Sequence, residues 1–90
     1  MRAWRIVYTN KTVTQLEMLD RPVRRQILNR LEWLAENFEI IQPAPLHGDW
    51  KGFFKLRVGD WRIVYDFVSI KQLIRVHQID RRDKIYKKRR

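Results

Sequence analysis

Basic side chains stand two or four residues apart at Lys51, Lys55 and Arg57 in the segment of residues 48–66 (GDWKGFFKLRVGDWRIVYD). Successive side chains of a β-strand point to opposite faces, so this spacing places Lys51, Lys55 and Arg57 on one face. Cations held on a rigid sheet suit the binding of phosphate groups. We therefore expect a phosphate site on this segment.

The same segment has the pattern of a β-hairpin, with Gly59-Asp60 as its tight turn. Before the turn, the face opposite the cations is expected to carry Phe54, Leu56 and Val58. After the turn, the cationic face is expected to continue with Arg62, Val64 and Asp66, and the apolar face with Trp61, Ile63, Tyr65 and Phe67.

The net charge limits the kind of partner. The 90 residues include 20 Lys and Arg against 10 Asp and Glu, which gives a net charge of +10 and a pI near 10.7. So basic a chain favours a polyanionic partner, above all a nucleic acid. The length predicts one domain over residues 1–90. The chain has no cysteine, no signal-peptide pattern and no apolar run long enough to span a membrane, so we expect a soluble, cytoplasmic protein without disulfides.

Two helices are expected in the first half of the chain. A strand over residues 4–9 (WRIVYT) should lead into a short helix that is capped by Asn10 or Thr12 and ends near Leu19. Asp20 is expected to cap a second helix with Pro22 in its first turn, and the two helices to form an antiparallel hairpin. The apolar stripe of the second helix consists of Val23, Ile27, Leu31, Leu34 and Phe38.

The second half of the chain completes an α+β domain. Residues 42–48, with two prolines and a glycine, are expected to form a loop that leads into the sheet. A third strand is expected over residues 71–79, followed by a basic tail over about residues 80–90. One strand, a helical hairpin and a three-stranded antiparallel meander predict a sheet with helices on its apolar face and an open cationic face.

These residues carry a family resemblance. The run Lys-Leu-Arg-Val-Gly-Asp-Trp-Arg-Ile-Val-Tyr, which ends at Tyr65, together with Arg82-Asp83-Lys84-Ile85-Tyr86, resembles the RelE branch of the RelE/ParE toxin superfamily. The order of elements is similar too. The resemblance implies the toxin of a type II toxin-antitoxin system, a ribosome-dependent endoribonuclease that cleaves messenger RNA in the ribosomal A site. It also implies a cognate antitoxin as partner, for which charge favours an acidic, disordered C-terminal segment.

The chemistry of such a site can be supplied by basic residues. Cleavage without a metal requires attack by the 2′-hydroxyl, so the site needs a base, an acid and cations for the developing phosphorane charge. The positions that match the family's catalytic groove are Lys55, Arg62, Arg82 and Tyr86. Lys55, crowded by other cations, is the candidate base, Arg62 and Arg82 would hold the phosphate, and one of these or Tyr86 would lie near the leaving group.

Other residues are candidates for substrate binding. They are Lys51, Phe53, Arg57, Arg81 and His77. Phe53 stands where the family has a second lysine, and could instead stack on a base. Arg81 is an alternative to Arg82, and His77, expected on the same face as Arg75 and Ile79, is a candidate acid-base group. No metal, cofactor or small-molecule ligand is expected, because the chain has no Asp-x-Asp pair and no Gly-rich phosphate loop.

Two functions of other classes remain open. One is a toxin of the ParE kind that binds DNA gyrase without catalysis, and the other is an RNA-binding module without catalysis. The retained Lys55 and Arg62 argue against the first, and Phe53 in place of a second lysine keeps the second open.

Overall fold

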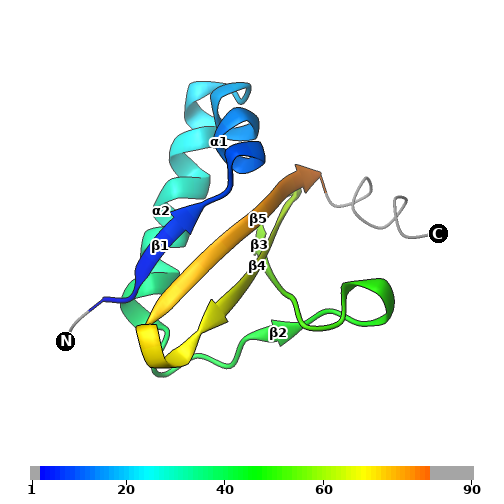
Figure 1. Cartoon of the computed structure of the whole chain (residues 1–90). Coiled ribbons are helices and arrows are strands. Elements are labelled where there is room, and N and C mark those ends of the chain that lie inside the picture. The colour runs from blue at the N-terminus through cyan, green and yellow to red at the C-terminus, as the bar shows by residue number, and fades with distance from the viewer. Residues whose placement is uncertain (1–2, 82–90) are drawn as a thin grey trace.

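The computed structural model describes residues 3–81, and five strands of this part of the chain form one mixed sheet. The elements are β1 (Arg5–Tyr8), α1 (Asn10–Glu17), α2 (Arg21–Asn37), β2 (Ala44–Pro45), β3 (Phe54–Val58), β4 (Trp61–Val68) and β5 (Leu73–Arg81). The strand order is β1-β5-β4-β3-β2, with β1 parallel to β5 and all other neighbours antiparallel. Both helices lie on one side of the sheet (Figure 1). The predicted α+β class is thus confirmed.

Helix α2 begins and packs as its sequence predicts. Asp20 is the N-cap residue, although its side chain makes no capping hydrogen bond, and Pro22 lies in the first turn. Ile27, Leu31 and Leu34 are fully buried. The apolar stripe at helical spacing therefore does face the sheet.

Helix α1 is capped by a residue other than the two that the sequence indicated. The hydroxyl of Thr9 accepts a hydrogen bond from the Thr12 amide at 3.2 Å, so neither Asn10 nor Thr12 is the cap. Thr12 is fully buried, and its hydroxyl donates to the Val76 carbonyl of β5 at 3.0 Å. The Thr12 side chain thus ties α1 to the sheet instead of closing the helix end. The helix also ends earlier than expected, at Glu17.

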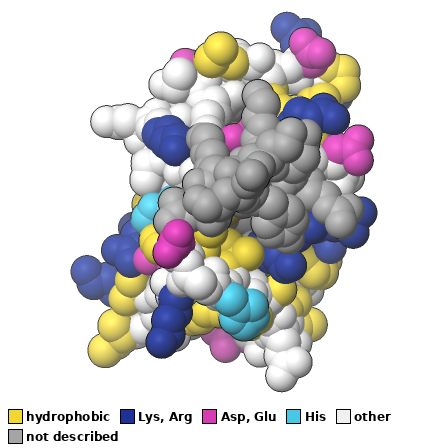
Figure 2. All heavy atoms as spheres, turned by 90° about the vertical axis from the view of Figure 1, so that its right-hand side faces the viewer, with side chains coloured by type: hydrophobic (Ala, Val, Ile, Leu, Met, Phe, Trp, Pro, Cys, Tyr) yellow, Lys and Arg dark blue, Asp and Glu magenta, His cyan; other side chains and the backbone are white. Residues whose placement is uncertain are grey.

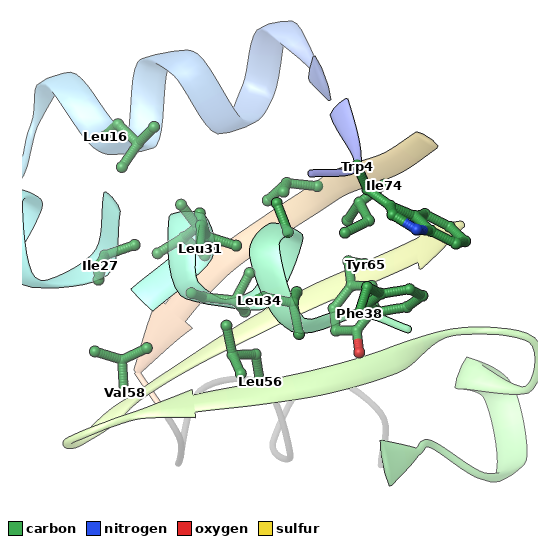
Figure 3. Packing of buried hydrophobic residues seen from close by; sticks show 14 residues of the cluster. Trp4, Leu16, Ile27, Leu31, Leu34, Phe38, Leu56, Val58, Tyr65 and Ile74 are labelled. Atoms are coloured by element: carbon green, nitrogen blue, oxygen red, sulfur yellow. The ribbon is translucent and has the colours of Figure 1, made fainter. Parts of the chain in front are cut away.

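The main core lies between the helices and the sheet (Figure 3). From β3 and β4 it includes Leu56, Val58, Ile63 and Tyr65, which confirms the predicted apolar face. Aromatic rings fill one end of it, where the Phe38 ring lies 4.6 Å from that of Trp4 and 4.9 Å from that of Phe67.

The other face of the sheet, here called the open face, is partly covered. Val64 alternates with the core residues of β4 and so lies on this face, yet it is fully buried. It forms a second apolar cluster with Leu46, and Trp50 and Phe53 pack against the pair. The expectation of a fully open cationic face was therefore wrong, because an apolar side chain at this position needs cover from water. The cover comes from residues 42–53, which were expected to begin as a plain loop but contain β2 and a 3₁₀ turn at Gly48–Trp50.

A β-bulge changes the alternation of side chains along β5. Tyr65 pairs with Val76 but Val64 pairs with Gln78, so His77 is an extra residue on β5. Beyond the bulge Ile79 lies in the main core, while His77 contacts Asp66 on the open face. The prediction that His77 and Ile79 share a face was wrong for this reason. Strand β5 also begins at Leu73, since Lys71 lies in a short 3₁₀ turn and Gln72 has a left-handed backbone (φ 50°).

No helix within residues 3–81 is both long and apolar enough to cross a membrane.

Candidate functional site

Three of the predicted site residues come together on neighbouring strands of the open face. Arg57 on β3 lies directly opposite Arg62 on β4, and Lys55 lies opposite Val64, one pair further along the same face. Like charges directly across a strand pair are unfavourable. An anion bound beside the two arginines would offset this repulsion. We call Lys55, Arg57 and Arg62 the basic triplet.

The members of the basic triplet differ in exposure. Arg62 is only 6% exposed, Lys55 is half-buried and Arg57 is exposed. The Arg57 side chain is oriented by a hydrogen bond that its Nε donates to the Gly59 carbonyl oxygen at 3.4 Å. A phosphate at this place would meet one arginine held by its surroundings and two side chains that can still adjust. Such a fixed cation needs little reorganisation when charge develops.

A carboxylate that the sequence pattern did not indicate lies beside the basic triplet. Asp80 on β5 is directly opposite Arg62 and shares its face because of the bulge at His77. Without the bulge, alternation would turn Asp80 to the helix side. The positive potential of the triplet is therefore lower at its β5 side than a count of arginines suggests.

Asp66, at the far end of the same face, organises a second polar cluster. Its carboxylate accepts hydrogen bonds from Arg75 Nε at 2.8 Å and a terminal Arg75 nitrogen at 2.6 Å, and its Oδ1 lies 2.8 Å from His77 Nε2. Burial alone would raise the pKa of Asp66, but the hydrogen bonds from Arg75 and His77 hold this pKa below its usual value. The Asp66 carboxylate in turn raises the pKa of Arg75. The sequence placed Asp66 on this face, but only the fold brought its two partners to it.

Phe53 contacts both the second apolar cluster and the polar cluster around Asp66. It is half-buried, and its ring lies edge-on to those of Trp50 at 5.7 Å and His77 at 5.1 Å. Its packing thus serves the second apolar cluster. Stacking of Phe53 on a base of the substrate stays a prediction.

The remaining predicted residues lie apart from the basic triplet or outside the described residues. Lys51 is exposed at the end of the 3₁₀ turn. Arg81 pairs with Trp61, a residue of the apolar face, and its guanidinium lies 5.9 Å from the centre of that ring. The structure therefore does not bring Arg81 to the triplet. Arg82 and Tyr86 lie outside the described residues.

Seen from the right-hand side of Figure 1, charged side chains of both signs lie on the surface (Figure 2). Carboxylates and histidine lie among the Lys and Arg side chains in this view. Within residues 3–81, His, Asp and Glu side chains form no group of three or more that could hold a metal ion. The side chains of the open face offer cations for phosphate binding, and basic and carboxylate groups for proton transfer.

Comparisons with known proteins agree on one superfamily. Residues 6–86 match the model of a family described as the ParE toxin of the type II toxin-antitoxin system parDE. No curated protein matches the chain.

Solved structures with the same fold include proteins of three bacteria. The RelBE2 toxin-antitoxin complex of Mycobacterium tuberculosis has a TM-score of 0.79 and 18% identity, with 91% of this chain and 94% of that chain covered. The isolated RelE toxin of E. coli has a TM-score of 0.73 and 18% identity over 96% and 94% of the two chains. The YoeB/ParE toxin of Agrobacterium tumefaciens has a TM-score of 0.69 and 25% identity over 86% and 96%. The chain is therefore similar in fold both to RelE toxins and to a toxin described as YoeB/ParE.

Proposed function

We propose that this chain, which belongs to the ParE toxin family of type II toxin-antitoxin systems within the RelE/ParE superfamily, arrests translation as an endoribonuclease. It would cleave messenger RNA in the ribosomal A site, by attack of a 2′-hydroxyl on the adjacent phosphorus. The superfamily includes endoribonucleases. The observation that supports this activity best is the basic triplet, in which Arg57 and Arg62 stand directly opposite each other beside Lys55.

The triplet suits the charge that develops in this reaction. Attack on phosphorus places extra negative charge on the phosphorane oxygens, and cations that are already in position stabilise it. Arg62, almost fully buried, would hold the phosphate, and the half-buried Lys55 would take the proton of the 2′-hydroxyl. The proton for the leaving 5′-oxygen would come from Arg82 or Tyr86, which remain candidates from the sequence alone.

The test is primer extension on a translated reporter messenger RNA after induction of the toxin. Wild type should produce new 5′ ends inside codons only while translation proceeds. Lys55→Ala should remove them, and Lys71→Ala, which deletes an exposed cation of the turn before β5, should not. Lys55 is preferred to the buried Arg62 as the main variant because its loss should leave the fold intact, which circular dichroism checks. New 5′ ends that persist in Lys55→Ala would contradict the assigned role of Lys55.

A second candidate function is inhibition of DNA gyrase, and the family match favours it because that model describes ParE. Asp80 opposite Arg62 also fits a face that docks on a protein better than one that only binds phosphate. Arrested growth with intact transcripts, together with gyrase-dependent DNA breaks in purified reactions, would select this function.

We also propose an antitoxin partner with an acidic segment. The related Mycobacterium tuberculosis RelBE2 proteins were crystallised as a toxin-antitoxin complex. A net charge of +10 and an open face with the basic triplet favour a partner of opposite charge. Co-expression with the product of the neighbouring reading frame should yield a complex that survives purification at low salt. If the two products separate under those conditions, the proposed pairing is wrong.

A further inference from the structure

A groove between α2 and β3 runs along the side of the molecule next to the open face. It consists of two adjoining hollows of about 410 Å³ and about 230 Å³. Both hollows are lined by Arg30, Trp33 and Arg57. We call the two hollows together the α2–β3 groove.

The groove exists because β3 is only partly covered. The two-residue strand β2 pairs with Phe54 and Lys55 and leaves the rest of β3 at the edge of the sheet. Arg57 belongs to the open face by its register, yet it also lines the groove beside α2. Arg57 therefore joins the groove to the basic triplet, and Lys55 lines the smaller hollow as well.

The charge of the groove is one-sided. Among the described residues 3–81, it is lined by Arg30, Arg57 and Lys55 and by no Asp or Glu. The hollow on the opposite flank of α2, between this helix and β1, has the reverse character, because the described residues that line it include Glu32 and Glu36 and no Lys or Arg. Helix α2 thus separates an anionic flank from a cationic one. A polyanion that reaches the open face would be guided to the cationic flank.

The groove also contains a flat stacked pair. The guanidinium carbon of Arg30 lies 3.9 Å from the centre of the Trp33 ring. The Trp33 side chain is still 38% exposed, which is unusual for a tryptophan that only fills a core. Within residues 3–81 neither Arg30 nor Arg57 forms an ion pair. Nucleic acid bases stack on exposed aromatic rings and on arginine planes, and unpaired arginines bind phosphates.

We propose that the α2–β3 groove is a second binding site for single-stranded RNA, with a base stacked on the Arg30–Trp33 pair and phosphates held by Arg30 and Arg57. RNA as the ligand rests on the proposed function, and the groove extends the path of the strand beyond the triplet. An acidic peptide is the competing occupant. It would use the arginines but has no group that requires an exposed tryptophan stacked beneath a guanidinium.

The experiment measures binding of a labelled oligouridylate of about ten nucleotides to the purified full chain by fluorescence anisotropy, over a series of salt concentrations. Trp33→Ala should weaken binding by about 5- to 150-fold, the range that loss of one stacked base gives, and Trp33→Tyr should retain most of it. Arg30→Ala should lower the slope of log affinity against log salt by about 0.7, the value for one phosphate contact to a single strand. Arg25→Ala is the matched control, because it removes an exposed arginine of the same helix that lies outside the groove.

The outcomes separate this site from the proposed activity. Binding that falls in Trp33→Ala but not in Arg25→Ala supports the groove whether or not transcripts are cut in cells. Binding that is unchanged in Trp33→Ala, or that falls equally in Arg25→Ala, overturns the groove as a stacking site and leaves the ribonuclease proposal untouched. A parallel titration with an oligoglutamate peptide addresses the competing occupant. If this peptide binds and depends on Trp33 while the oligouridylate does not, the inference is wrong.

Discussion

Leu46→Ala should show how much the second apolar cluster contributes to stability. Leu46 is 9% exposed and packs on the fully buried Val64 of the open face. Its amide also donates to the Phe53 carbonyl at 2.9 Å, which closes the 46–53 segment on itself. Removing the end of this side chain therefore removes the main apolar anchor of that segment.

The expected loss of folding free energy depends on how deeply the truncated side chain is buried, on the open face or in the main core. Leu→Ala deletes about three carbon groups at about 0.8 kcal/mol each, so the lost transfer free energy is about 2.4 kcal/mol. The segment over Val64 lies at the surface and can settle into the gap, so the cavity term should be small and the total about 2–3 kcal/mol. Leu34→Ala, in the fully buried centre of the main core, should cost about 4 kcal/mol because helix and sheet hold that cavity open.

The assay is urea unfolding followed by tryptophan fluorescence, with far-ultraviolet circular dichroism as a second probe. The midpoint should fall without a change in the slope of free energy against urea. The thermal midpoint of Leu46→Ala should fall by roughly 10–20 °C for a domain of this size. Ile70→Ala, at a position that is 92% exposed, is the control and should stay within about 0.5 kcal/mol of wild type. A cost below about 0.5 kcal/mol for Leu46→Ala would show that Val64 is not covered as described, and the reasoning about the open face would fail.

Three further predictions concern the Asp66 cluster, the attachment of α1 and the hairpin turn. Because the folded pKa of Asp66 lies below its ordinary value of 3.8, the ionised carboxylate stabilises the fold above that value, and this contribution is lost as the pH falls through the folded pKa. Asp66→Asn, which cannot ionise beside Arg75 and His77, should thus lose stability less steeply than wild type below about pH 4, and parallel curves of urea midpoint against pH would contradict this. Thr12→Val should cost about 1 kcal/mol, since it deletes the buried hydroxyl that donates to β5 at 3.0 Å; an unchanged urea midpoint would show that this bond does not hold α1. Gly59→Ala should cost about 1–2 kcal/mol because φ is 58° while no atom lies within 4 Å of the added carbon, and Gly59→Asn should cost less; equal thermal midpoints for the two variants would refute a backbone origin.

Local periodicity predicted much of the fold. The spacing of Ile27, Leu31 and Leu34 describes one side of a helix, and the helix needs only one apolar partner to bury it. The alternation along β3 and β4 likewise assigned Leu56 and Ile63 to the core, because a strand without a bulge has no other way to turn its side chains. Such features depend on neighbours a few residues away, so they can be read from the chain.

The candidate site could be predicted only in part. Lys55, Arg57 and Arg62 come together as expected, since a tight hairpin sets their register. The place of Asp80 opposite Arg62 could not be predicted, because nothing in the residues around His77 marks the bulge that rotates the rest of β5. The capping residue of α1 was missed for a similar reason. Thr9 and Thr12 have equivalent side chains in the sequence, and only the Val76 carbonyl, far along the chain, decides which of them faces the sheet.

The sequence by itself determined the class of elements, the core faces of α2, β3 and β4, and a strong positive charge, because these follow from composition and from spacing along the chain. Tertiary structure alone decided where that charge acts. It buried Val64 under Leu46, gave Asp66 two partners on β5, and placed Arg57 beside Arg30 and Trp33 of α2. These contacts join residues that lie far apart in the chain, and the free energy of each depends on burial and on distances that exist only once helix and sheet have packed.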